Sequence, residues 1–225
     1  EKMKEIKNEL IKKNSNIFEN YDLKRQEGQN DSYICSLIRQ DSVIEFIQYV
    51  NKMNYSLTSQ IEESIFETNS FLIDNKNITL IEYSAFFGSI QILRYLLMNK
   101  VQLNPSLMLY AIHSKNAELI HLLESYQNNI FCVNSYIESI KCHHNDIAFY
   151  IENNLFTQDQ SNSKKIKEKI VSNCIKYHNY EQFKIDDIIE YGFFYLCLYE
   201  YNELVNILLK SKEEEIKIKI IQKLN

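Results

Sequence analysis

The stretch that decides the fold is Thr79-Leu-Ile-Glu-Tyr-Ser-Ala-Phe-Phe-Gly-Ser-Ile-Gln-Ile-Leu-Arg-Tyr-Leu-Leu97. It contains two apolar segments, Leu80–Phe87 and Ile92–Leu97, on either side of the pair Gly88-Ser89. The first segment has the small residue Ala85 near its centre, which lets neighbouring helices approach closely. The aliphatic residues of the second segment follow at helical spacing. The stretch therefore predicts a short first helix, a tight turn and a second helix.

A short phrase at the start of the second helix recurs along the chain. It consists of a small polar residue, usually Asn, then in most copies an acid within three positions, and then an aliphatic pair. The copies begin at Ser42, Ser89, Asn116, Asn145, Asn179 and Asn202, so they stand 47, 27, 29, 34 and 23 residues apart. Asn and Ser accept a hydrogen bond from an orphan N–H group, and an acid suits the positive end of the helix dipole. Each copy is predicted to begin a helix, and Ser42 with Glu45 has the spacing of a capping box.

Apolar segments of similar length precede every copy of the phrase. They are Tyr33–Ile38, Leu80–Phe87, Leu107–Ile112, Tyr136–Cys142, Ile170–Ile175 and Phe193–Leu198. Self-similarity at a period of ~20–50 residues indicates a solenoid or an array. The uneven spacing predicts a degenerate stack of helix-turn-helix units with insertions.

The quoted stretch resembles an ankyrin repeat. The matching positions are Thr79, Ala85, Gly88, Ile92-Leu93 and Leu96-Leu97. Over residues 30–155 the chain is also similar to a divergent ankyrin family that is expanded in parasitic protists such as trichomonads. The resemblance implies an all-α fold, an ankyrin-like α-solenoid of stacked helix-turn-helix repeats, and a role in protein binding.

Departures from the ankyrin pattern concern the helix start and the β-hairpin fingers. Leu80 and Glu82 replace the Pro and His of the Thr-Pro-Leu-His tetrapeptide, and Lys100-Val101-Gln102 replaces the Gly-Ala-Asp of the finger. Without that Gly, a turn with positive φ is harder to form. We therefore expect reduced or absent fingers.

The pattern divides the chain into three regions. Residues 1–30 are predicted to form an amphipathic leader helix, residues 31–155 the ankyrin-like repeats, and residues 156–225 divergent helical repeats of the same solenoid. Further helices are expected around Gln60–Thr68 and over residues 216–224.

Composition and charge exclude several classes of protein. A net charge of -5 disfavours nucleic acid as the main partner, because phosphate binding needs a basic surface. Three Gly are too few for a glycine-rich phosphate cradle. The longest apolar stretch, near Tyr191–Tyr199, is less than half of the ~20 residues that span a bilayer. Five dispersed Cys suit a reduced, cytoplasmic setting.

Catalytic and metal-binding residues form no recognisable pattern in the sequence. Cys142, His143 and His144 are adjacent, but no Cys-x-x-Cys pair accompanies them, and zinc motifs need four ligands at characteristic spacings. Cysteines within first helices are expected to be buried and inert. We expect no catalytic residue, no cofactor and no metal site.

The predicted function is a non-enzymatic scaffold that binds a protein partner of unknown identity, as a monomer. The residues expected to contact the partner lie on first helices and in the turns that follow them: Phe86, Phe87, His113, His143, His144, Tyr177 and His178. Two alternatives stay open. One is a regulatory or substrate-recruiting segment of a larger multidomain protein, which a start at Glu1 rather than Met permits. The other is an enzyme or metal-binding protein whose site is hidden between C-terminal repeats.

Overall fold

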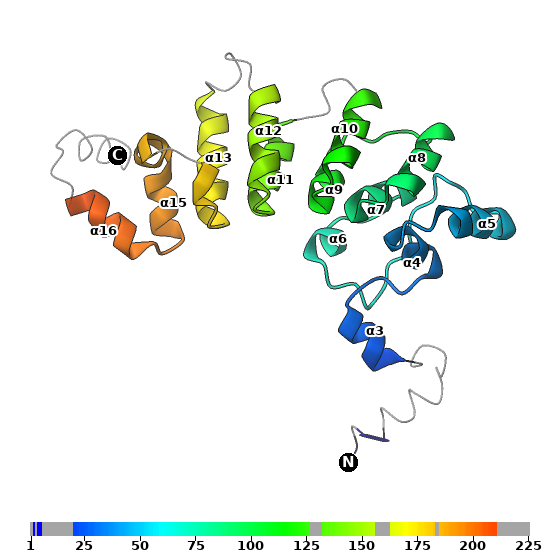
Figure 1. The fold of residues 1–225 in the computed structure, drawn as a ribbon. Coiled ribbons are helices and arrows are strands. Elements are labelled where there is room, and N and C mark those ends of the chain that lie inside the picture. The colour runs from blue at the N-terminus through cyan, green and yellow to red at the C-terminus, as the bar shows by residue number, and fades with distance from the viewer. Residues whose placement is uncertain are drawn as a thin grey trace. The chain divides into compact units, whose positions relative to one another are not determined.

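All regular secondary structure of the computed structural model is helical in the residues that the structure describes (Figure 1). These are residues 2, 4–5, 20–126, 132–155, 163–182 and 185–210. The all-α prediction is confirmed for them, and none of their helices is long and apolar enough to cross a membrane. The chain divides into two compact units, Glu1–Leu103 and Asn104–Asn225.

The first unit contains α3 (Tyr21–Glu27), α4 (Tyr33–Arg39), α5 (Val43–Met53), α6 (Ser70–Asp74), α7 (Leu80–Phe87) and α8 (Ile90–Met98). Helix α4 packs against α5 and α7, and α8 packs against α5 and α7. The first helices of the two pairs, α4 and α7, are thus neighbours, and so are the second helices, α5 and α8. This arrangement is repeat-like. Their common core includes the fully buried Ile38, Phe46 and Leu93, and each such side chain contributes ~1.5–3 kcal/mol on burial.

The second unit contains α9 (Leu107–Ser114), α10 (Ala117–Tyr126), α11 (Val133–Lys141), α12 (Asn145–Leu155), α13 (Lys164–Lys176), a 3-10 turn η1 (Tyr180–Gln182), α14 (Ile185–Asp187), a π turn η2 (Ile188–Gly192), α15 (Phe193–Leu198) and α16 (Asn202–Lys210). The first helices of the pairs form a row, because α9 packs against α11, α11 against α13, and α13 against α15. Second helices or turns lie beside them: α10 packs on α9, α12 on α11, and α16 on α15. The predicted first helices are therefore confirmed in both units.

One backbone conformation recurs where each first helix ends. In all six helix pairs a residue with a positive φ, between 49° and 71°, follows the first helix, either directly or after one further residue. These residues are Asp41, Gly88, Lys115, His143, His178 and Glu200. Each donates its N–H to the carbonyl three residues earlier, which closes the helix. A left-handed residue other than Gly costs ~1–2 kcal/mol, so this recurrence marks one structural position of a repeat.

In four of these pairs the next residue in the chain joins its helix pair to the pair before it. Its side chain donates a hydrogen bond to a backbone carbonyl at the end of the preceding first helix. The bonds run from Ser89 Oγ to Ile38, from His144 Nδ1 to Ile112, from Asn179 Nδ2 to Ile140 and from Tyr201 OH to Ile175. The acceptors are Ile at the same position in four helices, and helix ends have carbonyls without an intrahelical partner. We call this set of bonds the carbonyl ladder.

Side-chain caps occur at several helix starts, among them those of α10 and α7. Asn116 Oδ1 accepts from Leu119 N at 3.2 Å, so its predicted cap is confirmed. A capping box also forms, but between Thr79 and Glu82, where the Glu82 carboxylate accepts from Thr79 N at 2.9 Å. Glu82 thus has a local structural role at the position where the ankyrin pattern has His.

The capping box predicted for Ser42 and Glu45 is wrong. Ser42 makes no side-chain cap bond to α5. The preceding residue, Asp41, instead caps helix α8 of the next pair: its carboxylate oxygens accept from Gln91 N and Ile92 N, both at 3.0 Å. Asp41 can do so because its left-handed backbone directs it away from its own helix.

The caps predicted at Asn145 and Asn202 are also displaced by one residue. Both Asn residues are the first residues of their helices, α12 and α16. Asn145 instead contacts the following turn: its Oδ1 accepts from Asn179 Nδ2 at 2.7 Å, and its Nδ2 donates to Glu181 at 2.6 Å. The phrase therefore starts helices, yet in the copy at Asn145 its polar residue connects helix pairs.

The helix predicted around Gln60–Thr68 is wrong. This segment is extended, with Ile61 N bonded to Ile78 O at 2.8 Å and an isolated antiparallel bridge between Gln60 and Thr79. The nearby helix is α6, which begins one residue after Asn69 and is capped by that side chain. Non-local pairing with the residues before α7 competes successfully with local helix formation here.

No strand, and therefore no β-hairpin finger, occurs in the residues that the structure describes; the sequence predicted reduced or absent fingers. Lys100 adopts a φ of 58° although it is not Gly, and Val101 N bonds to Leu96 O, which ends α8. Of the predicted leader helix, only α3 is described as a complete helix, and residues 6–19 lie outside the described part. The predicted helix over residues 216–224 also lies outside it.

Cysteine burial differs from the prediction for first helices. Cys35 and Cys174 are buried as expected, and burial raises the pKa of the Cys174 thiol to about 12. Cys197 is exposed, and Cys142 is half-buried at the end of α11.

Candidate functional site

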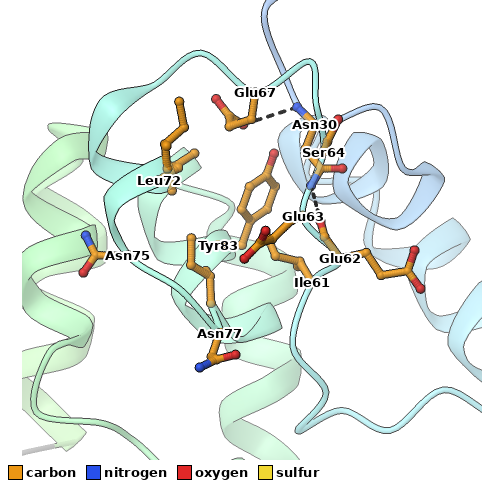
Figure 2. Close-up of a pocket in the computed structure, with 12 residues that line it drawn as sticks. Asn30, Ile61, Glu62, Glu63, Ser64, Glu67, Leu72, Asn75, Asn77 and Tyr83 are labelled. Carbon is orange, nitrogen blue, oxygen red and sulfur yellow. Dashed lines mark hydrogen bonds between the residues drawn. The ribbon is translucent and has the colours of Figure 1, made fainter.

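The first unit holds a pocket beneath the segment that joins α5 to α7 (Figure 2). It measures about 520 Å³, part of which is open to solvent. Its wall combines the carboxylates of Glu62, Glu63 and Glu67 with the apolar side chains of Ile61, Leu72 and Ile78.

Asn30 holds the wall of this pocket in place. The side chain is only 3% exposed. Its Nδ2 donates to the carbonyl of Glu62 at 2.7 Å, and its backbone N–H donates to Glu67 Oε2 at 3.2 Å; both bonds are drawn in Figure 2. The other oxygen of Glu67 accepts from the backbone N–H groups of Thr68 and Asn69. Asn30 and Glu67 are therefore structural parts of the pocket.

Tyr83 closes the pocket from the side of α7. Its ring is fully buried, and its hydroxyl accepts from Arg39 Nη1 at 2.9 Å. The same Arg39 nitrogen donates to the carbonyl of Asn30 at 2.8 Å. Burial raises the pKa of Tyr83, so its hydroxyl is neutral over the physiological range.

Glu62 and Glu63 give the pocket its accessible charge. Both residues are exposed, and in Figure 2 the carboxylate of Glu63 points toward Tyr83 whereas that of Glu62 points away from it. Glu67 is half-buried and held by backbone amides. Carboxylates above an apolar wall suit a group with an aliphatic stem and a cationic end, such as a Lys or Arg side chain.

The predicted aromatic pair lies beside this pocket on α7. Phe86 is buried and stacks on Phe71 of α6, with ring centroids 5.9 Å apart. Phe87 is half-buried, with its ring 4.7 Å from that of Tyr83 and 6.0 Å from the Arg39 guanidinium. Phe86 thus belongs to the packing between helices, and Phe87 is the more accessible of the two.

In the second unit, His113 meets two residues that sequence reasoning did not connect with it. Its Nε2 lies 3.1 Å from Glu138 Oε1, and its ring nitrogens lie 3.6 and 3.8 Å from the Cys142 sulfur. Lys141 Nζ donates to the other Glu138 oxygen at 3.0 Å. We call His113, Glu138 and Cys142 the His–Glu–Cys cluster.

Burial and hydrogen bonds together set the charge of the cluster. Glu138 is 8% exposed. Burial raises the Glu138 pKa, but hydrogen bonds from His113 and Lys141 outweigh burial, so the pKa lies below its usual value. Burial and the neighbouring Glu138 charge raise the pKa of the Cys142 thiol to about 12. The metal-free cluster therefore contains a carboxylate and a neutral thiol.

The remaining predicted contact residues occupy the turns after α11 and α13. His143 and His178 are the exposed left-handed residues of these turns, and His144 belongs to the carbonyl ladder. Tyr177 is half-buried at the end of α13, with Lys141 Nζ 5.7 Å from its ring centroid. The structure thus connects His113 to Tyr177 through Glu138 and Lys141, and His143 takes no part in this chain of contacts.

Several important residues escaped sequence reasoning. Asn30, Glu62, Glu63 and Glu67 lie outside the recurring phrase, so the repeat pattern drew no attention to them. Glu138 stands four residues before Cys142, a helical spacing that was visible in the sequence. Its proximity to His113 was not, because 25 residues separate the two.

No protein-family profile, curated protein or solved structure matches this chain.

Proposed function

We propose that this protein is a non-catalytic protein-binding module, built as a divergent ankyrin-like solenoid, whose acidic pocket receives a basic side chain of its partner. The observation that carries the proposal is the pocket in the first unit, whose lining combines the exposed Glu62 and Glu63 with apolar side chains. Its walls are preorganised by the bonds of Asn30, which lowers the entropic cost of binding.

The repeat-like order of the helices supports the same proposal. The left-handed turn and the carbonyl ladder recur at one position of successive helix pairs, as in a stack whose neighbouring repeats contact each other. Stacks of this kind present extended surfaces suited to binding other proteins. The likeness of Thr79–Leu97 to an ankyrin repeat is consistent with this architecture.

Selection of peptides on the purified chain tests the proposal. A random peptide library displayed on phage should yield binders with Lys or Arg, and a selected peptide carrying a fluorophore gives its affinity by anisotropy. The double variant Glu62→Gln/Glu63→Gln should weaken binding of that peptide about 2- to 30-fold. Each exposed ion pair contributes ~0.2–1 kcal/mol, and the variant removes two carboxylates.

A matched control removes two exposed glutamates that do not line the pocket. Glu27→Gln/Glu45→Gln changes the net charge by the same amount and should leave the affinity within experimental error. Binders without basic residues, or equal weakening by both double variants, would contradict the assignment of this pocket.

A further inference from the structure

The His–Glu–Cys cluster combines three metal-ligand types from two neighbouring helices. Glu138 and Cys142 stand four residues apart on α11, so their side chains project from one face of the helix. His113 comes from α9, which packs directly against α11. The ligand atoms of the three residues all lie within 4.8 Å of one another.

The spacing of these atoms is close to that around a tetrahedral zinc ion. With Zn–N and Zn–O near 2.1 Å and Zn–S near 2.3 Å, tetrahedral geometry separates N from O by ~3.4 Å and N from S by ~3.6 Å. The observed separations are 3.1 Å from His113 Nε2 to Glu138 and 3.6 and 3.8 Å from the ring nitrogens to the Cys142 sulfur. Because the sulfur is almost equidistant from both ring nitrogens, binding also requires a turn of the imidazole that aims one lone pair at the ion.

We propose that His113, Glu138 and Cys142 bind a zinc ion in the second unit, with a fourth position for water or for a group of a binding partner. Imidazole, carboxylate and thiolate are all zinc ligands, and sites with three protein ligands keep an open coordination position. The thiolate and the carboxylate together balance the two positive charges of the ion. The inference stands independently of the acidic pocket, which lies in the other unit.

The surroundings of the cluster fit this role. Lys141 bonds to Glu138 Oε2, so Oε1 is the oxygen directed toward His113 and the ion. A bonded second oxygen orients a carboxylate ligand, as outer-shell partners do in metal sites. The ion binds with loss of one proton from the Cys142 thiol, because the thiolate is the ligand.

Metal titration of the whole chain tests the inference. After treatment with a chelator and its removal, the protein is given Zn²⁺ and analysed by mass spectrometry of the metal, and it should retain one equivalent. Co²⁺ should give a thiolate-to-cobalt charge-transfer band and the strong visible absorption of a tetrahedral site. Less than a tenth of an equivalent of bound Zn²⁺ in the wild-type chain would overturn the proposal, whatever the variants do.

Variants assign the ligands. Cys142→Ser should abolish the charge-transfer band, and Glu138→Gln should weaken Zn²⁺ binding at least about tenfold, as loss of a metal-site group does. The control Cys197→Ser removes an exposed thiol outside the cluster and should keep the band and the stoichiometry. Circular dichroism identifies a variant that fails to fold. A band that persists in folded Cys142→Ser, or disappears in Cys197→Ser, places the metal elsewhere and overturns the assignment.

Discussion

Asp41 is expected to stabilise the first unit although it lies outside the helix that it caps. Its two carboxylate oxygens accept from Gln91 N and Ile92 N of α8, each at 3.0 Å. Replacement of an N-cap by Ala costs ~0.5–2 kcal/mol. Asp41 also has a φ of 49°, a conformation that is ~1–2 kcal/mol unfavourable for an L-residue such as Ala and is better tolerated by Asp or Asn. The two terms together predict a loss of about 1.5–4 kcal/mol for Asp41→Ala.

Other substitutions at Asp41 separate the two terms. Asp41→Gly removes the cap but accepts the left-handed backbone, so only the cap loss of ~0.5–2 kcal/mol remains. Asp41→Asn keeps one oxygen acceptor and tolerates the backbone, so it loses mainly the charge–dipole interaction of ~0.3–1 kcal/mol. The matched control is Ser42→Ala, expected within ~0.5 kcal/mol of wild type because Ser42 makes no side-chain cap bond.

Urea unfolding followed by far-ultraviolet circular dichroism measures the differences in stability. Hydrogen exchange adds a local readout, because the amides of Gln91 and Ile92 should lose protection in Asp41→Ala and keep it in Ser42→Ala. The reasoning would be refuted if Ser42→Ala were the more destabilising change, or if Asp41→Ala left both amides protected.

Three further predictions concern the second unit. Asn116→Ala removes the bond to Leu119 N and should cost ~0.5–2 kcal/mol of stability in urea, and no loss would mean that α10 is not capped there. Lys115→Gly should leave stability unchanged or raise it by up to about 1 kcal/mol, because relief of the left-handed backbone outweighs the greater chain entropy of Gly; a lower melting temperature would contradict this. Burial lowers the pKa of His144 below its unfolded value of 6.5, the Ile112 bond opposes this, and Lys115 lowers it further. The unfolded chain thus binds more protons below that value, so the stabilising contribution of His144 is present above pH 6.5 and is lost as the pH falls through the folded pKa. In a chelator, His144→Asn, which keeps a donor for the Ile112 carbonyl, should lose less stability than wild type between about pH 7 and 5, and identical pH profiles would argue against it.

Local patterns predicted the helix pairs well because their causes are local. The apolar spacing of Leu80–Phe87 and the side chain of Thr79 act within one or two turns, so both helix and cap follow from neighbouring residues. The same reasoning failed over Gln60–Thr68, where pairing with residues near Ile78 decides the conformation. It also failed for Ser42, since the adjacent Asp41 caps a helix some 50 residues ahead.

The candidate sites were less predictable than the helices. His113 was selected from its place on a first helix, but neither Glu138 nor the participation of Cys142 followed from it. The acidic pocket depends on Asn30 and Glu67, whose contact spans 37 residues and lies outside every copy of the phrase. No periodic pattern in the sequence connects two residues that are so far apart and lie outside the phrase.

The sequence by itself determined that the chain forms pairs of short helices, where most of them begin, and which small residues lie between them. Those properties depend on apolar periodicity and on hydrogen bonds within a few residues. Only the tertiary structure decided which helix pairs share a cap, which carbonyls accept from the next pair, and which side chains gather into the pocket and the His–Glu–Cys cluster. The physical reason is the uneven length of the repeats, since successive copies of the phrase stand between 23 and 47 residues apart. With such variation, the positions that meet across neighbouring helices cannot be obtained by counting along the chain and are set by packing.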